Sequence, residues 1–487
     1  MECVNATSLR RKSGQWGTQH LLPVRQNTPS GRDWGAPVFW KELDTSALMS
    51  ILQAVRGTRD LLPPETELWN HIETTARKVF ERYSFGEIRT PIFEDTLLFS
   101  RGVGEETDIV SKEMYTFTPE ARIQGESTQS LTLRPENTAG VVRAYIEHQL
   151  GETGQLQKLY YIGPQFRRER PQRGRYRQFF QIGAEVIGPP SAGSESPLRD
   201  AEVLEMLATL LSELGITGWR LLLNSVGSAT DRPRYVQVLR TALEPVVSRM
   251  CEDCQRRAVT NPLRVLDCKH PEDQPIIATL PRIWESLDEG SKEHFAAVCT
   301  ALDACGVPYE HDHRLVRGLD YYTRTTFEFV YDEPGEGGLG SQNALLGGGR
   351  YDGLSEAIGG PKAPGIGFAI GEDRLVLVLE AQGRHTPQLA AAYVAPLGDR
   401  MNPAALALAR ELRATGLRAE LGDGSFRLKK SFEAANKVAR AIVILGEDEV
   451  ASGILTVKHF ASGEQFKVPR AQLAEKLASF PNPPTSN

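Results

Sequence analysis

The chain has 487 residues, of which 40% are hydrophobic and 24% charged, and its formal net charge is −6. This composition is typical of an ordinary globular protein, and the length favours roughly three domains. The negative net charge excludes a global field that draws the chain to nucleic acid, so any such binding must come from local basic patches. No apolar run approaches membrane-span length, which predicts a protein without a membrane partner.

Residues 1–48 are predicted to be a disordered extension, because they are polar and lack hydrophobic periodicity. Their basic excess permits an organelle transit peptide. However, they contain no good amphipathic stretch, and Met49 immediately precedes the organised sequence. A segment upstream of the true start is therefore an equally weighted alternative.

The first organised elements are an amphipathic helix over Leu68–Tyr83 and a strand over Phe85–Phe93 that Pro91 interrupts. Proline suits a sheet edge or a bulge, so this strand is expected at a border or subunit contact. Two short strands, Met114–Phe117 and Ser130–Leu133, follow around a polar turn.

Glu136 and Thr138 lie where the second of these strands passes into a helix over Ala139–Leu150. Loop side chains at such transitions often carry chemistry. The alternative is that Thr138 or Asn137 caps the helix, and both roles can coexist.

The most informative stretch is Tyr160–Gly188, which packs six arginines between strand-like ends. Pro171 and Gly174 interrupt it, which predicts two antiparallel strands joined by a basic loop. Side chains alternate along strands, so polar residues share one face on each strand, with Gly183 leaving a gap between Gln181 and Glu185. We interpret this face as the floor of a small polar ligand site, against the alternative of an exposed basic hairpin. The residues of this face are Gln165, Arg167, Glu169, Arg177, Phe179, Gln181, Gly183 and Glu185.

Residues 225–312 differ from their surroundings and are predicted to form a helical insertion. They contain Cys251, Cys254, Cys268 and His270 in a C-x2-C-x13-C-x-H pattern that could hold zinc. No second ligand pair follows with the usual finger spacing. We therefore favour loop cysteines and predict no metal site.

Three further segments complete the predicted core. Leu315–Val330 begins with Arg317 and continues as a β-rich run, and a glycine triplet, Gly347–Gly349, allows close backbone approach to a ligand. A small-residue strand then feeds a helix over Glu372–Glu380. Arg374 in its first turn is unfavourable for the helix dipole, which suggests an anionic ligand or an acidic neighbour, or a tolerated exposed arginine.

After a polar linker, strands and helices alternate in a predicted compact α/β domain. A basic run in it is either a solvated face or a phosphate contact. It consists of Arg427, Lys429, Lys430, Lys437 and Arg440.

From about Gln53 to the C-terminus the chain resembles the histidyl-tRNA synthetase family, a class II aminoacyl-tRNA synthetase family. FRRERPQRGRYRQFFQIGAEVIG resembles the second class II motif, GIGFAIGEDRL the third, and LVRGLDYYTRTTFEF the histidine-specific segment. RGTRDLLPPE, TLRPENTAG, NPLRVLDCK and GGGRYDGL resemble further family segments.

The resemblance implies an α+β fold: a class II antiparallel sheet flanked by helices (49–383), interrupted by a helical insertion (225–312) and followed by an α/β anticodon-binding domain (390–487). It implies a cytoplasmic homodimer whose contact uses the early helix and the Pro-interrupted strand. The expected reaction has two steps. ATP and L-histidine form histidyl-adenylate with Mg2+, and the histidyl group then moves to the 3′ end of histidine tRNA.

The resemblance assigns the α-phosphate to Arg167 and Arg317 as catalytic residues, and Arg167 also to the histidine carboxylate. A planar guanidinium binds phosphate through two parallel hydrogen bonds. Arg374 resembles the γ-phosphate arginine. ATP binding as a whole is assigned to Arg167, Glu169, Arg175 and Arg374.

Histidine binding is likewise assigned by resemblance. Glu136, Thr138 and Gln181 resemble ligands of the amino and carboxylate groups, while Glu185 and Tyr322, with Tyr321 beside them, resemble the group that recognises the imidazole. A carboxylate and a phenol suit a ring with one donor and one acceptor. Arg167 and Arg317 complete the set.

Two rival interpretations remain. One is the regulatory subunit of ATP phosphoribosyltransferase, a non-catalytic paralogue without the C-terminal domain; the presence of Glu136, Arg317, Arg374 and that domain argues against it. The other is a nucleic-acid-binding or stress-sensing module on the same fold, which would not need every ATP-facing arginine. Asn137 stands where many family members carry glycine, but it also tolerates left-handed backbone angles.

Overall fold

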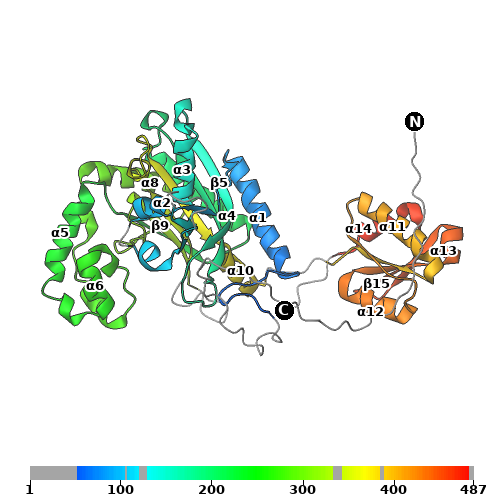
Figure 1. Cartoon of the computed structure of the whole chain (residues 1–487). Helices are drawn as coiled ribbons and strands as arrows, with labels where there is room; N and C mark the ends of the chain where they lie inside the picture. Colours follow the sequence, from blue (N-terminus) through cyan, green and yellow to red (C-terminus); the bar gives the residue numbers. More distant parts are fainter. Residues whose placement is uncertain (1–51, 105–106, 120–128, 333–342, 384–388, 482–487) are drawn as a thin grey trace, which may run out of the picture. The chain divides into compact units, whose positions relative to one another are not determined.

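A computed structural model describes residues 52–104, 107–119, 129–332, 343–383 and 389–481. The predicted extension at 1–48 therefore lies outside the described residues. The centre of the larger region is an eight-stranded sheet (Figure 1). Its six middle strands pair with one another in antiparallel fashion, and each edge strand pairs with its neighbour in parallel. In spatial order the strands are β1 (Gly86–Glu87), β5 (Gln157–Phe166), β6 (Gln178–Ile187), β11 (Gly365–Gly371), β10 (Ala344–Arg350), β9 (Thr323–Tyr331), β7 (Trp219–Ser225) and β8 (Glu310–His311).

Four helices bury their apolar faces against this sheet in one hydrophobic core. On the first of them, Ile72, Ala76, Val79 and Phe80 recur at helical spacing and are fully buried. This arrangement confirms the predicted antiparallel sheet flanked by helices. The helices are α1 (Glu65–Arg82), α4 (Pro197–Glu213), α8 (Glu289–Cys305) and α10 (Glu372–Ala381).

The prediction of one strand over Phe85–Phe93 is wrong. Gly86–Glu87 pairs in the large sheet, whereas Phe93–Asp95 (β2) belongs to a separate three-stranded sheet with β4 (Leu131–Leu133) and β3 (Tyr115–Phe117). The physical reason is Pro91, which has no N–H to donate to a ladder. Around it, the carbonyls of Thr90 and Pro91 accept hydrogen bonds from Arg134 instead.

Short helices and turns link the other elements of the two sheets along the chain. Asp95 caps the first of them by accepting from the Leu97 N–H at 2.8 Å. They are α2 (Thr96–Val103), a π-helix (Ile109–Glu113), α3 (Thr138–Glu147), 3-10 turns at Leu150–Thr153 and Pro190–Ala192, and α9 (Leu354–Ala357).

The region predicted as a helical insertion contains α5 (Asp231–Leu243), α6 (Glu252–Thr260), α7 (Gln274–Ile277) and α8, together with 3-10 turns at Val247–Arg249, Pro262–Val265, Pro271–Asp273 and Ile283–Ser286. Its first three helices share a separate hydrophobic cluster. In contrast, Phe295, Val298 and Leu302 of α8 pack into the main core. The separately packed part of the insertion therefore ends before α8.

The C-terminal region is built on a five-stranded mixed sheet with its own core. In spatial order its strands are β13 (Ala419–Leu421), β12 (Ala392–Pro396), β14 (Ala441–Leu445), β15 (Ile454–His459) and β16 (Gln465–Pro469); the sequence patterns did not predict the last. The helical elements are α11 (Asn402–Ala414), α12 (Leu428–Val438), α13 (Glu447–Ser452), α14 (Leu473–Ala478) and 3-10 turns at Asp399–Met401 and Arg470–Gln472. None of the described helices combines the length and the apolar composition that a membrane span requires.

Candidate active site

A cavity of about 1100 Å³ opens beside the β5–β6 hairpin and is closed on other sides by β9–β11, the start of α3 and the insertion. Its volume lies at the upper end of the range that ligand pockets span. Ten of the eleven predicted site residues line it: Glu136, Thr138, Arg167, Glu169, Arg175, Gln181, Arg317, Tyr321, Tyr322 and Arg374. The eleventh, Glu185, lies directly beneath and touches the lining residues Thr138 and Tyr351.

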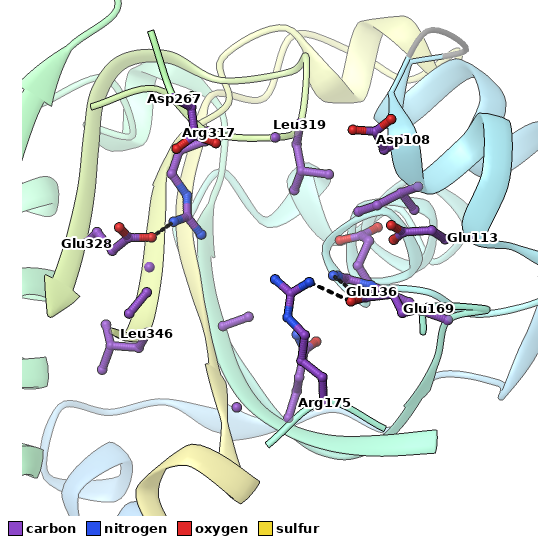
Figure 2. A pocket seen from close by; sticks show the side chains of 18 of the residues that line it. Asp108, Glu113, Glu136, Glu169, Arg175, Asp267, Arg317, Leu319, Glu328 and Leu346 are labelled. Carbon is purple, nitrogen blue, oxygen red and sulfur yellow. Dashed lines mark hydrogen bonds and ion pairs between the residues drawn. The ribbon is translucent and has the colours of Figure 1, made fainter. Parts of the chain in front are cut away.

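The hairpin loop aims two arginines at the cavity. Gln172 and Arg175 exchange backbone hydrogen bonds across a turn in which Gly174 has a φ of 73°, a value that glycine adopts without strain. Arg175 then pairs with Glu169 at 2.7 Å (Figure 2). The Arg167 Nε donates to the carbonyl of Pro135 at 2.9 Å, which orients its guanidinium.

Arg317 approaches the cavity from the opposite wall, and Figure 2 shows its ion pair with Glu328. Its guanidinium lies against Gly347, where an added Cβ would sit 2.6 Å from a guanidinium nitrogen. The glycine triplet was predicted to admit a ligand. Its first residue instead makes room for the arginine that faces the ligand space.

Arg374, in the first turn of α10, donates to the carbonyl of Ala344. Burial, together with the positive charges of Arg175 and Arg317, lowers the pKa of Arg374 to about 10. Neighbouring cations that destabilise one another form a cavity that favours a polyanion. This supports the anionic-ligand interpretation of Arg374 over that of an exposed surface arginine.

Glu136 caps α3. Its carboxylate accepts from the N–H groups of Thr138 at 2.7 Å and Ala139 at 2.9 Å. The alternative that Asn137 or Thr138 supplies the cap is wrong, since Asn137 makes no side-chain cap bond and the Thr138 hydroxyl donates to Glu185. A carboxylate is the stronger acceptor at the positive end of a helix dipole.

Glu185 is fully buried on β6 and accepts from Thr138 Oγ1 and Tyr351 Oη, each at 2.7 Å. Burial raises the pKa of its carboxyl to about 8, although both hydrogen bonds oppose that shift. Each carboxylate oxygen carries two lone pairs, so Glu185 can still accept a further N–H.

Tyrosines surround this carboxyl. The rings of Tyr321 and Tyr322 lie 4.8 Å apart and those of Tyr321 and Tyr351 6.0 Å apart. Burial raises the pKa of all of them, so their hydroxyls remain protonated and able to donate at neutral pH.

The gap at Gly183 was predicted to be room for a ligand, and this is wrong. Tyr161, directly opposite on β5, occupies it: a Cβ on Gly183 would lie 2.3 Å from the Tyr161 phenol. The Tyr161 hydroxyl lines the cavity, is buried and has no hydrogen-bond partner among the described residues. Tyr161 therefore offers the ligand a polar group that the gap alone could not.

Sequence reasoning missed Glu113, Tyr161 and Tyr351 as lining residues. Tyr161 could have been found from its cross-strand partner, Gly183. An aromatic side chain opposite a glycine can occupy the space that the missing Cβ leaves. Tyr351 follows the glycine triplet directly.

The basic run of the C-terminal region separates into two roles. Arg427, Lys429, Lys430 and Lys437 are exposed at and along α12. Arg440 is half-buried and donates to the carbonyl of Phe480, so its role is structural.

Comparison with known proteins gives the family of this chain. Residues 57–375 match the family model described as histidyl-tRNA synthetase, and residues 391–480 match an anticodon binding domain. The chain is 69% identical to a histidine–tRNA ligase of Koribacter versatilis over 87% of this chain and 95% of that protein. It is 54% identical to one of Solibacter usitatus, over 89% and 100% respectively.

Solved structures extend the agreement to the fold. The apo histidyl-tRNA synthetase of S. aureus has a TM-score of 0.70 at 37% identity and covers 88% of this chain and 100% of its own. A Bacillus halodurans protein titled ATP phosphoribosyltransferase regulatory subunit/histidyl-tRNA synthetase shares only the fold, at a TM-score of 0.58 and 19% identity. Two matching domains and high identity along most of its length show that this chain belongs to the histidyl-tRNA synthetase family of class II aminoacyl-tRNA synthetases.

Proposed function

We propose that this chain activates L-histidine with ATP to form histidyl-adenylate and transfers the histidyl group to the 3′ end of histidine tRNA. One observation carries the proposal: an arginine-lined space for a polyanion and a tyrosine-walled space above the buried carboxyl of Glu185 belong to one cavity. The 69% identity to a histidine–tRNA ligase supports this enzyme rather than the non-catalytic regulatory subunit.

Adenylate formation places negative charge on the α-phosphate in the transition state, and fixed cations stabilise it. We assign this role to Arg167 and Arg317, with Arg167 also holding the histidine carboxylate. Arg317 arrives from a different wall of the cavity, so the two guanidiniums can hold the phosphate from two sides. Arg175 and Arg374 would meet the distal phosphates, and Glu169 would orient Arg175 while contributing to ATP binding.

The histidine pocket is assigned by chemistry. Glu136 and Thr138 would bind the ammonium and carboxylate ends of the substrate. Gln181 would join them, since its Oε1 is buried without a hydrogen-bond partner among the described residues. Glu185 would accept from one imidazole nitrogen, while Tyr322, with Tyr321 beside it, would donate to the other.

We also propose Mg2+ as the companion of ATP. Mg2+ in such sites is held by one or two carboxylates together with substrate phosphates. Burial raises the pKa of Glu113, and the nearby charge of Glu169 raises it further, so a divalent cation would stabilise both carboxylates. The ion would neutralise charge on the phosphates, while the chain's own arginines position them.

A homodimer is proposed on the apolar surface around the small sheet. Ile92, Phe93, Leu97 and Phe117 are each at least 45% exposed in the isolated chain. Such a patch on a protein surface marks an interaction site. Light scattering should give twice the chain mass, and Phe93→Asp should give the monomer mass.

We further propose that the enzyme works in the cytoplasm and that its C-terminal domain binds the tRNA anticodon.

Histidine-dependent exchange of pyrophosphate into ATP tests the proposal directly, because it measures the first step without tRNA. Exchange no greater than that without histidine would overturn it. Removal of residues 390–487 should spare the exchange and weaken tRNA charging. Unchanged charging would refute the role given to that domain.

A further inference from the structure

The insertion brings three cysteines and one aspartate together at a single point. One ligand atom from each of Cys251, Cys254, Cys268 and Asp273 lies within 4.8 Å of all the others. The first two lie at the start of α6. Cys268 precedes the 3-10 turn Pro271–Asp273, and Asp273 is the last residue of that turn, directly before α7. The sequence pattern suggested His270 as the fourth member, but that residue is exposed and outside the group.

Two of the distances between these groups match those around one tetrahedral ion. Zinc–sulfur bonds of about 2.3 Å at tetrahedral angles separate two ligand sulfurs by about 3.8 Å and a sulfur from a carboxylate oxygen by about 3.5 Å. Cys251 Sγ and Cys268 Sγ are 3.9 Å apart, and Cys268 Sγ is 3.3 Å from Asp273 Oδ2. The cysteines are free thiols and do not form a disulfide.

The surroundings hold the four groups in place. Cys254 and Asp273 are fully buried and Cys268 is 8% exposed. The Cys251 N–H donates to Asp273 Oδ1 at 3.0 Å, and the His270 N–H donates to Cys268 Sγ at 3.3 Å. Amide donors to ligand sulfurs and carboxylates are the outer partners that orient metal ligands.

A buried carboxylate beside three buried or half-buried thiols is costly unless a cation offsets it. Thiolate-rich tetrahedral ligand sets select zinc among the common divalent ions. We propose that Cys251, Cys254, Cys268 and Asp273 bind one structural zinc ion. This assignment reverses the expectation of simple loop cysteines, and it makes Asp273 a ligand in place of His270.

The proposed ion connects α6 to the segment that precedes α7, and both line the catalytic cavity. Cys251, Cys268 and the intervening Asp267 lie in its wall. Arg264, four residues before Cys268, reaches Asp108 on the opposite side at 3.4 Å. Zinc would therefore hold the insertion wall rigid without touching the reacting atoms.

The test is the metal content of the full-length protein, purified without a histidine tag under reducing conditions and measured by mass spectrometry of the elements. We expect about one zinc per chain, since four ligands close a structural site. Replacing zinc with Co2+ should give thiolate-to-cobalt charge-transfer absorption in the near ultraviolet. Cys254→Ser and Asp273→Ala should lose most of the zinc. His270→Ala and Cys305→Ser, which alter exposed residues outside the group, should retain it.

A variant could lose zinc because it misfolds rather than because it lacks a ligand. An experiment on the wild-type protein distinguishes these two causes. A thiol-blocking reagent should release zinc to a metal-sensitive dye while circular dichroism reports the helices that remain. Metal-free wild-type protein, or a disulfide between Cys251 and Cys268, would overturn the proposal. Zinc lost from His270→Ala but kept by Asp273→Ala would overturn the ligand assignment. None of these measurements depends on aminoacylation, so the proposed reaction can fail while the metal site stands.

Discussion

The two halves of the cavity differ in how far their charged groups are exposed to water. On the phosphate side, Arg175 and Arg317 are partly exposed and each is paired with a glutamate. On the histidine side, Glu185 is fully buried among hydroxyl donors. Solvated cations stay charged and can bind a highly charged ligand. Discrimination of one small ring instead requires buried polar groups, because leaving such groups without a hydrogen-bond partner is costly. The comparison predicts large rate effects from the first half and large specificity effects from the second.

The largest effect is expected for Arg317→Ala. Loss of one fixed donor to a developing charge lowers the rate about 10²- to 10³-fold, so histidine-dependent ATP–pyrophosphate exchange should fall by that factor. The matched control is Arg314→Ala, which alters an exposed arginine three residues earlier that does not line the cavity. Near-normal exchange in a folded Arg317→Ala protein would refute the assignment.

The next effect is expected for Glu185→Gln. The amide cannot replace a charged acceptor, and hydrogen bonds to charged groups are worth about 1.5–3 kcal/mol, so the KM for histidine should rise roughly 10- to 100-fold. The KM for ATP should change little. Glu195→Gln, which breaks only a surface ion pair with Lys362, serves as the control. Equal losses for both substrates would show that Glu185 supports the whole cavity rather than the imidazole pocket.

A smaller effect concerns pH. The pKa of Glu185 is about 8, and ionisation is needed to accept from imidazole, so the KM for histidine should fall as pH rises through that value. Tyr351→Phe removes a hydrogen bond that stabilises the carboxylate, and should move this transition upward by up to about one pH unit. A downward shift would contradict the donor role of Tyr351.

Stability should respond with the opposite sign. Folded Glu185 keeps its proton up to about pH 8, while the unfolded chain releases it near its ordinary value. The contribution of this group is therefore complete below the unfolded pKa and is lost as pH rises through 8. Glu185→Gln should flatten the decrease in unfolding temperature between about pH 5 and about pH 8, measured by calorimetry. An unchanged slope would mean that other groups cause it.

The smallest effect is expected away from the cavity. We expect exposed residues of α12 to contact tRNA phosphates. Lys429→Ala should then raise the KM for tRNA a few-fold, and it should reduce the slope of log affinity for tRNA against log salt concentration by about one. Pyrophosphate exchange should stay constant. The control is Glu433→Ala on the same exposed helix. An identical salt dependence would exclude Lys429 from the contact.

Strand alternation and local motifs determined the sheet-and-helix class and the basic hairpin from the sequence by itself, because both depend on near neighbours. The family resemblance added site residues, ten of which line the cavity. Tertiary structure alone decided what occupies each gap. Tyr161 fills the space at Gly183, Arg317 fills that at Gly347, and Glu136 rather than Asn137 caps α3. Only folding brought Asp273 to the three cysteines in place of His270. These outcomes depend on register and packing between distant segments, which no local pattern encodes.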